Sequence, residues 1–216
     1  MVSIESPQQQ HQIKGTLLYH EPPKVSVNED DDEDSNSNSS FYDSNITVFG
    51  EILRGESPAI TYAESDNLLA FEDMHPRAPL HALIIPKRFI GSVFDLESSS
   101  SQSQTTSHQI PNDLALLEEM QNMAEQLLQE QHPAAYKQGD YTLCFHIPPF
   151  NSVDHLHLHV LAPASQMKTY FRFIKYQTGT VWCTSLMKVL QRLRTGKSAV
   201  PYSRPSRKTP LVDFLY

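Results

Sequence analysis

Residues 151–163 read N-S-V-D-H-L-H-L-H-V-L-A-P, with a histidine at every second position from 155 to 159. Successive side chains of a β-strand point to opposite faces of the sheet, so a strand here places His155, His157 and His159 on one face. The apolar residues between them then lie on the other face. The pattern therefore predicts a strand over residues 155–161 with one face available for chemistry and the other packed in a core.

The alternation elsewhere in the chain, together with the turn residues, predicts an α+β fold with a mainly antiparallel five-stranded sheet and two helices. The other four strands are expected over residues 59–63, 68–71, 80–85 and 141–145. Apolar residues at helical spacing predict the two helices over residues 113–132 and 181–193, and a short helix over residues 46–54 precedes the first strand. In the strand 80–85, His81 projects from one face of the sheet.

Both ends of the chain and one internal stretch have compositions that do not form a core. Residues 1–45 include the acidic run E-D-D-D-E-D, and we expect them to be a disordered acidic tail. Residues 98–108 are rich in serine and are expected to be a flexible insertion. Residues 196–216 are expected to be a basic C-terminal tail, which leaves residues 46–195 as the folded domain.

The chain of 216 residues has a net charge of -8 and fits a single domain. No apolar run approaches the length of a membrane span and no signal sequence is visible, so we expect a cytoplasmic or nuclear protein without a membrane partner. Cys144 and Cys183 stand among apolar residues and are expected to be buried thiols. Basic residues dominate after Ser165, but no zinc-finger spacing accompanies them, so a nucleic-acid partner is not expected.

Three histidines on one strand face need a chemical explanation, because every buried imidazole requires hydrogen-bond partners. Neutral imidazoles are common zinc ligands, but Asp154 precedes His155 and points to the opposite face, so no acid continues a ligand pattern. The other chemistry is nucleophilic attack on phosphorus by an oriented neutral imidazole. His157 has a histidine on each side and is the natural nucleophile. Phosphorus chemistry is therefore the leading interpretation, and metal binding is the runner-up.

These residues resemble the histidine triad superfamily of nucleotide hydrolases and transferases, whose signature alternates three histidines with apolar residues. The resemblance covers residues 46–163 and includes F-G-E-I-L-R-G-E-S-P-A, L-A-F-E-D-M-H-P-R-A-P-L-H-A-L-I-I-P-K-R-F-I and F-N-S-V-D-H-L-H-L-H-V. The chain is similar to the Hint branch of that superfamily, and within it to the third, adenosine phosphoramidase-type subgroup. The resemblance thus implies the fold of this superfamily and a hydrolase of adenylated substrates.

Catalytic roles follow from the resemblance. It implies that His157 attacks phosphorus and carries a transient AMP, while His159 and His81 stabilise charge at the α-phosphate. It also implies that His155 orients the nucleophile and that Ser152 protonates an amine leaving group. Because the nucleotidyltransferase branch has glutamine in place of the third histidine, His159 favours hydrolysis with water as the final acceptor.

Nucleotide binding is implied for a second set of residues. Asp73 would hold the ribose hydroxyls, as a carboxylate that accepts two hydrogen bonds can. The remaining nucleotide-binding residues are Asn151 and, around the base, Val48, Phe49, Phe71, Met74 and Leu83. The expected partner is a nucleotide substrate. An adenosine 5'-phosphoramidate is the first choice, and an adenylated carboxylate or sulfate comes next.

Departures from the family pattern bear on metal and leaving group. Residues 47–50 read T-V-F-G where the subgroup often has a C-x-x-C pair, and Phe89 stands where a histidine is frequent. We therefore expect no zinc and no cofactor. Pro148 and Pro149 leave the preceding loop with fewer N–H donors for a phosphate. A homodimer, as in the main Hint group, stays open, as do two other functions: a nucleotide-binding or scaffold protein with weak hydrolysis and, less favoured, a histidine-ligated zinc enzyme.

Overall fold

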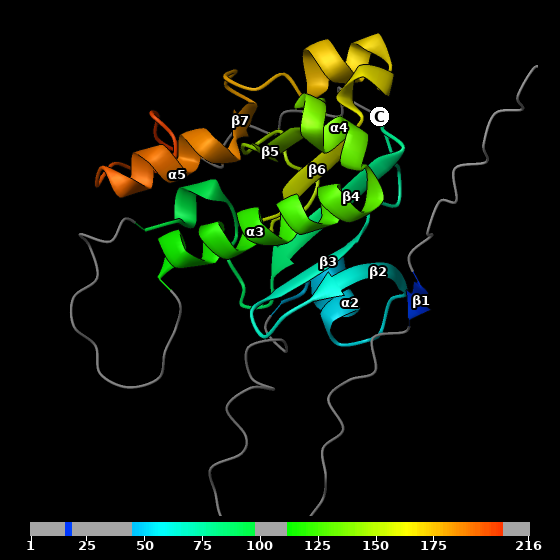
Figure 1. Ribbon diagram of the computed structural model, residues 1–216. Helices are drawn as coiled ribbons and strands as arrows, with labels where there is room; N and C mark the ends of the chain where they lie inside the picture. Colours follow the sequence, from blue (N-terminus) through cyan, green and yellow to red (C-terminus); the bar gives the residue numbers. More distant parts are fainter. Residues whose placement is uncertain (1–15, 19–44, 98–111, 205–216) are drawn as a thin grey trace, which may run out of the picture.

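The computed structural model describes residues 16–18, 45–97 and 112–204. They form one antiparallel sheet with the strand order β1-β2-β3-β4-β6-β5-β7, on which the helices pack as Figure 1 shows. The strands are β1 (Thr16–Leu18), β2 (Ala59–Glu64), β3 (Leu68–Glu72), β4 (Leu80–Pro86), β5 (Thr142–His146), β6 (Leu158–Ala162) and β7 (Cys183–Ser185). The helices are α2 (Val48–Leu53), α3 (Asp113–Gln131), α4 (Pro133–Gln138) and α5 (Leu186–Arg194). The expected α+β class with an antiparallel sheet is confirmed.

Two short strands extend the sheet beyond the five that the sequence predicts. β1 lies within the expected tail and pairs with β2, and β7 lies within the stretch 181–193 that was expected to be helical. β7 pairs with β5, and the Ser185 side chain then accepts a hydrogen bond from the Lys188 N–H, which begins α5 five residues later than expected. β6 also begins late, at Leu158, so His155 and His157 precede the strand instead of lying in it.

The long helix α3 begins and ends where the sequence indicates. The Asn112 side chain accepts a hydrogen bond from the Ala115 N–H at 2.6 Å, which caps the first turn. Pro133 was expected only to stop α3, but it occupies the first turn of α4, where a helix needs no N–H donor. Between β6 and β7 the chain forms a π-helical turn over Phe171–Lys175, which no sequence pattern indicated.

Alternation along the strands gives the sheet two differently covered faces. One face packs against α3 and α5 in the largest apolar cluster, to which β4 contributes Leu80, Ala82 and Ile84; Figure 1 shows α3 lying across the sheet. Leu83 points the other way, into a cluster with Phe49 of α2. On that second face Leu161 packs against residues 164–182, which we call the covering segment. The histidines lie on this second face, between α2 and the covering segment.

The folded unit continues past the expected boundary at residue 195. Ala199 and Val200 are buried in the largest apolar cluster, and Arg204 forms an ion pair with Asp95 at 2.5 Å. The expected insertion 98–108, the acidic run 29–34 and residues 205–216 lie outside the described residues. Within the described part of the chain, no helix is long and apolar enough to cross a membrane.

Candidate active site

Four histidines, from β4, from β6 and from the residues just before β6, are buried together on the second face of the sheet. His155, His157 and His159 are 1%, 5% and 4% exposed, and His81 of β4 is 1% exposed. β4 and β6 are adjacent and antiparallel, and their register pairs Leu83 with His159, which brings His81 alongside the row. His155 and His157 therefore lie on the same face as His159, as the sequence predicts, although they precede β6.

His157 is held in one tautomer by a main-chain carbonyl. Its Nδ1 lies 2.7 Å from the carbonyl oxygen of His155. A carbonyl oxygen can only accept, so Nδ1 carries the hydrogen and donates it. Burial lowers the pKa of His157 below its ordinary value, so the ring is neutral and its Nε2 keeps a lone pair. This is the form that a nitrogen nucleophile requires.

His155 is fixed at both of its ring nitrogens, and neither bonds to another histidine. Nε2 donates to the Pro86 carbonyl at 2.9 Å, and Nδ1 accepts from the Asn45 side chain at 2.8 Å. Burial lowers the pKa of His155 to about 4, in keeping with a neutral ring. His155 thus contacts His157 by accepting a hydrogen bond at its carbonyl oxygen. The imidazole of His155 holds the main chain to which that oxygen belongs.

His81 and His159 form a short hydrogen-bond relay that ends in an unpartnered donor. The Arg77 N–H donates to His81 Nδ1 at 3.2 Å, so His81 carries its hydrogen on Nε2, 3.0 Å from His159 Nδ1. Burial lowers the pKa of both rings, and neutral His159 therefore has its hydrogen on Nε2. That buried N–H has no hydrogen-bond partner among the described residues. An unsatisfied buried donor is costly and calls for an acceptor from a ligand.

Two further residues complete the cluster and were missed by the sequence analysis. His146 of β5 donates from Nε2 to the Lys175 carbonyl at 3.2 Å, which leaves a lone pair on Nδ1. One ring nitrogen each of His146, His157 and His159 lies within 4.8 Å of the others. Tyr176 of the covering segment contacts three of the histidines, with its ring centre 5.1 Å from that of His146. The strand register could have revealed His146, because Cys144 pairs with His159, whereas no sequence signal indicated Tyr176.

The residues expected around the base are divided between buried and exposed positions. Phe49, Phe71 and Leu83 are buried in one cluster, and the Phe49 ring centre lies 5.4 Å from that of His157. Val48 is 40% exposed and Met74 is 81% exposed. The buried three therefore form an apolar wall beside the nucleophile, whereas Val48 and Met74 are not part of it.

Asp73 and Asn151 lie beside histidines of the cluster, and Ser152 follows Asn151 in the chain. Asp73 accepts from the His75 N–H at 2.8 Å, and its other carboxylate oxygen lies 3.3 Å from His81 Nε2. Asn151 lies with His146 and His157 around a small hollow, and its side chain donates to the Val153 carbonyl at 3.0 Å. Ser152 is exposed, and its side chain makes no hydrogen bond to the described residues.

The donor pattern of the cluster suits an anion better than a cation. His146, His157 and His159 are close enough to hold a metal ion, as are Asp73, His81 and His159, among the described residues. A metal needs a lone pair from each ligand. In the first group the free Nε2 of His159 carries a hydrogen, and in the second His81 carries its hydrogen on the Nε2 that faces His159 Nδ1. The His159 N–H can donate to a phosphate oxygen beside the His157 lone pair.

Comparisons with known proteins find a family model and several named relatives to which the chain is similar. The profile of a family described as "Scavenger mRNA decapping enzyme C-term binding" matches residues 46–172. Adenosine 5'-monophosphoramidase HINT3 of Mus musculus is 31% identical over 155 residues, covering 71% of this chain and 84% of that protein. Bifunctional adenosine 5'-phosphosulfate phosphorylase/adenylylsulfatase HINT4 of Arabidopsis thaliana is 36% identical over 115 residues, covering 53% of this chain and 68% of that protein.

Proposed function

The chain belongs to the histidine triad superfamily, and on that premise we propose that it releases AMP from adenosine 5'-phosphoramidates or related adenylated small molecules, through a covalent AMP adduct on His157. The names of the relatives support this substrate class. The mouse relative is called an adenosine 5'-monophosphoramidase, and the Arabidopsis relative is named for its action on adenosine 5'-phosphosulfate. Both names refer to an adenosine 5'-phosphoryl group joined to a leaving group.

The tautomers of His157 and His159 carry the proposal. The Nδ1 hydrogen of His157 is committed to the His155 carbonyl, so Nε2 offers a lone pair. The unpartnered Nε2–H of His159 lies in the same cluster, with ring centres 4.9 Å apart. If a phosphoryl group binds here, the His157 lone pair can attack its phosphorus and the His159 N–H can donate to one of its oxygens. Such a donor stabilises the negative charge of the transition state.

Each of two displacements would exchange one bond to phosphorus. In the first, His157 Nε2 forms a bond to the α-phosphorus while the bond to the leaving nitrogen breaks. That nitrogen keeps the electron pair and takes a proton from Ser152, which is exposed and regains a proton from solvent. In the second, water attacks the phosphorus, the bond to Nε2 breaks and AMP leaves. One proton of that water needs an acceptor, and His146 Nδ1 has a free lone pair within the cluster.

The rest of the nucleotide would lie between α2 and the loop that follows β3. Phe49, Phe71 and Leu83 offer an apolar wall for the base beside His157. Asp73, whose side chain is 18% exposed, would accept hydrogen bonds from the ribose hydroxyls. In this arrangement the α-phosphate lies over the histidines and the leaving group points toward the hollow lined by Asn151 and His146.

The test is turnover of adenosine 5'-phosphoramidate by the purified full chain, with intact-mass detection of an AMP adduct after acid quench. His157→Ala should lose at least about 10³-fold in kcat, because the residue forms the bond to phosphorus, and should give no adduct. His132→Ala is the matched control, since His132 lies between α3 and α4 on the far face of the sheet. Full turnover by His157→Ala would overturn the proposal. AMP binding without turnover in the unmodified chain would favour a nucleotide-binding protein instead.

A further inference from the structure

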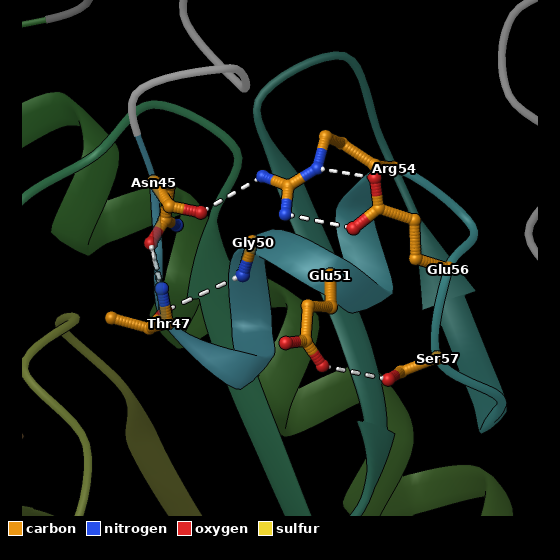
Figure 2. Close-up of polar contacts among 7 residues, drawn as sticks. All are labelled: Asn45, Thr47, Gly50, Glu51, Arg54, Glu56 and Ser57. Carbon is orange, nitrogen blue, oxygen red and sulfur yellow. Dashed lines mark hydrogen bonds and ion pairs between the residues drawn. The ribbon is translucent and has the colours of Figure 1, made fainter.

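Asn45 is a buried polar residue that the catalytic proposal leaves unused. It precedes α2 by three positions and is 2% exposed. Its side chain and main chain bond to three different parts of the fold: His155, the residue that caps the start of α2 and the residue that follows its end. Figure 2 shows Asn45 beside Thr47, with the Arg54 guanidinium reaching toward it.

The orientation of the Asn45 amide follows from its neighbours. Its Oδ1 accepts from the Thr47 N–H at 3.1 Å and from the Thr47 hydroxyl at 2.7 Å. Both of these donate, so the oxygen must face Thr47 and the NH2 group must face His155, whose Nδ1 lies 2.8 Å away. The bond is therefore a donation from Asn45 to an imidazole lone pair.

The main chain of Asn45 is held from both ends of α2. Arg54, which follows the last residue of the helix, donates to the Asn45 carbonyl at 2.8 Å and is itself held by the Glu56 carboxylate at 2.8 and 2.9 Å. Gly50, in the first turn, packs so closely that an added Cβ would lie 2.0 Å from that carbonyl oxygen. Asn45 is therefore fixed to both ends of α2.

A single protonation state of His155 satisfies both of its hydrogen bonds. The Pro86 carbonyl needs a hydrogen on Nε2, and the Asn45 NH2 group needs a lone pair on Nδ1. The carbonyl of the same residue then receives the Nδ1–H of His157 at 2.7 Å. The position of that carbonyl, and with it the direction of the nucleophilic lone pair, depends on where the His155 ring is held.

We propose that Asn45 is a positioning residue that fixes the tautomer of His155 and ties the nucleophile to α2. The proposal rests on the hydrolase function above and extends it. α2 also carries Phe49, whose ring contacts those of His155 and His157, with centres 5.9 and 5.4 Å away. Phe49, which forms part of the wall for the base, and His157, which attacks phosphorus, are thus both attached to α2. The attachment of His157 runs through His155 and Asn45.

The sharpest test replaces the donor by an acceptor of the same shape. Asn45→Asp keeps an oxygen for both Thr47 contacts and leaves the carbonyl for Arg54, but it sets a carboxylate against the His155 lone pair. His155 then has to take up a proton to restore the contact, as an imidazole beside an acid does. We expect kcat for adenosine 5'-phosphoramidate to fall about 10- to 100-fold, with the dissociation constant for AMP unchanged within about twofold, because Phe49 and α2 stay in place.

Nitrogen NMR of the full chain provides a readout that loss of stability would not produce. At pH 7 the His155 ring of the unmodified chain should be neutral with its hydrogen on Nε2, and that of Asn45→Asp should be an imidazolium. Asn112→Asp is the matched control, because the α3 cap uses only the side-chain oxygen of Asn112 and a carboxylate supplies it equally. Its kcat and its His155 signals should be those of the unmodified chain.

The outcomes separate this proposal from the hydrolase function. If the unmodified chain turns over substrate and Asn45→Asp keeps its kcat, Asn45 does not position the nucleophile and only this proposal falls. A hydrogen on His155 Nδ1 in the unmodified chain would overturn it as well, even if Asn45→Asp does not fold. An unmodified chain without turnover on any adenylated substrate would overturn both.

Discussion

Acidification should destabilise the protein through histidines that the fold keeps neutral. Burial lowers the pKa of His146 and of His155 from 6.5 to about 4. In the unfolded chain each imidazole takes up a proton near pH 6.5, whereas in the folded chain it does so only near pH 4. Between these values the unfolded state binds more protons, so the free energy of unfolding falls as the pH falls. At pH 5 the loss is about 2 kcal/mol for each ring, a large share of a typical total of about 5–15 kcal/mol.

A variant isolates the contribution of one ring. The free energy of unfolding in urea would be measured at pH 7.5 and pH 5 for the unmodified chain and for His146→Asn. The substitution lowers stability at both pH values, but it removes one titrating group, so the fall between the two should be smaller by about 2 kcal/mol. Asn112→Ala, which removes the α3 cap but no titrating group, should leave the fall unchanged. An equal fall in His146→Asn and the unmodified chain would refute the view that burial holds His146 neutral.

Two further predictions follow from the same geometry. Gly50→Ala should lower the free energy of unfolding by about 1–3 kcal/mol, because the new Cβ would lie 2.0 Å from the Asn45 carbonyl oxygen; urea unfolding at pH 7.5 measures this, and a variant of unchanged stability would contradict the close packing. Between pH 7.5 and pH 6 the initial rate per folded molecule should fall less than the protonation of a free imidazole would make it fall, because burial lowers the pKa of His157 below its ordinary value. A free imidazole would be mostly protonated at pH 6, and a matching loss of rate would contradict a buried neutral nucleophile.

Elements with a complete local signal could be predicted from the sequence. α3 has a capping residue at Asn112, apolar residues at helical spacing and a proline after its end, and all three signals are local. Strands β2, β3 and β4 show residues that alternate between the two faces, bounded by turns. β7 has no such signal, because three residues cannot establish a period and only pairing with β5 makes Cys183–Ser185 extended. β7 is followed at once by α5, so the helical spacing of apolar residues led us to expect a helix over β7 as well.

The candidate site shows the same division between local and distant signals. The sequence predicts a site at His155, His157 and His159 because three histidines at every second position are rare in a core. His81 could be predicted from the alternation in its own strand. His146 stands in a strand that reads simply as apolar, and only the register with β6 brings it into the cluster. Asn45 lies 110 positions before the ring that it holds. Contacts of this kind depend on the assembled fold and leave no periodicity in the chain.

Tautomers give the buried histidines unequal roles. An imidazole has two nitrogens, and a fold that served only stability would give both a partner. The nitrogens with partners are both of His81, both of His155, Nδ1 of His157 and of His159, and Nε2 of His146. Without a hydrogen-bond partner in the described part of the chain are a lone pair on His157, a lone pair on His146 and an N–H on His159. A nucleophile, a base and a donor to an oxyanion are what displacement at phosphorus requires, so the histidine nitrogens that the fold leaves unsatisfied are the ones that the proposed reaction would use.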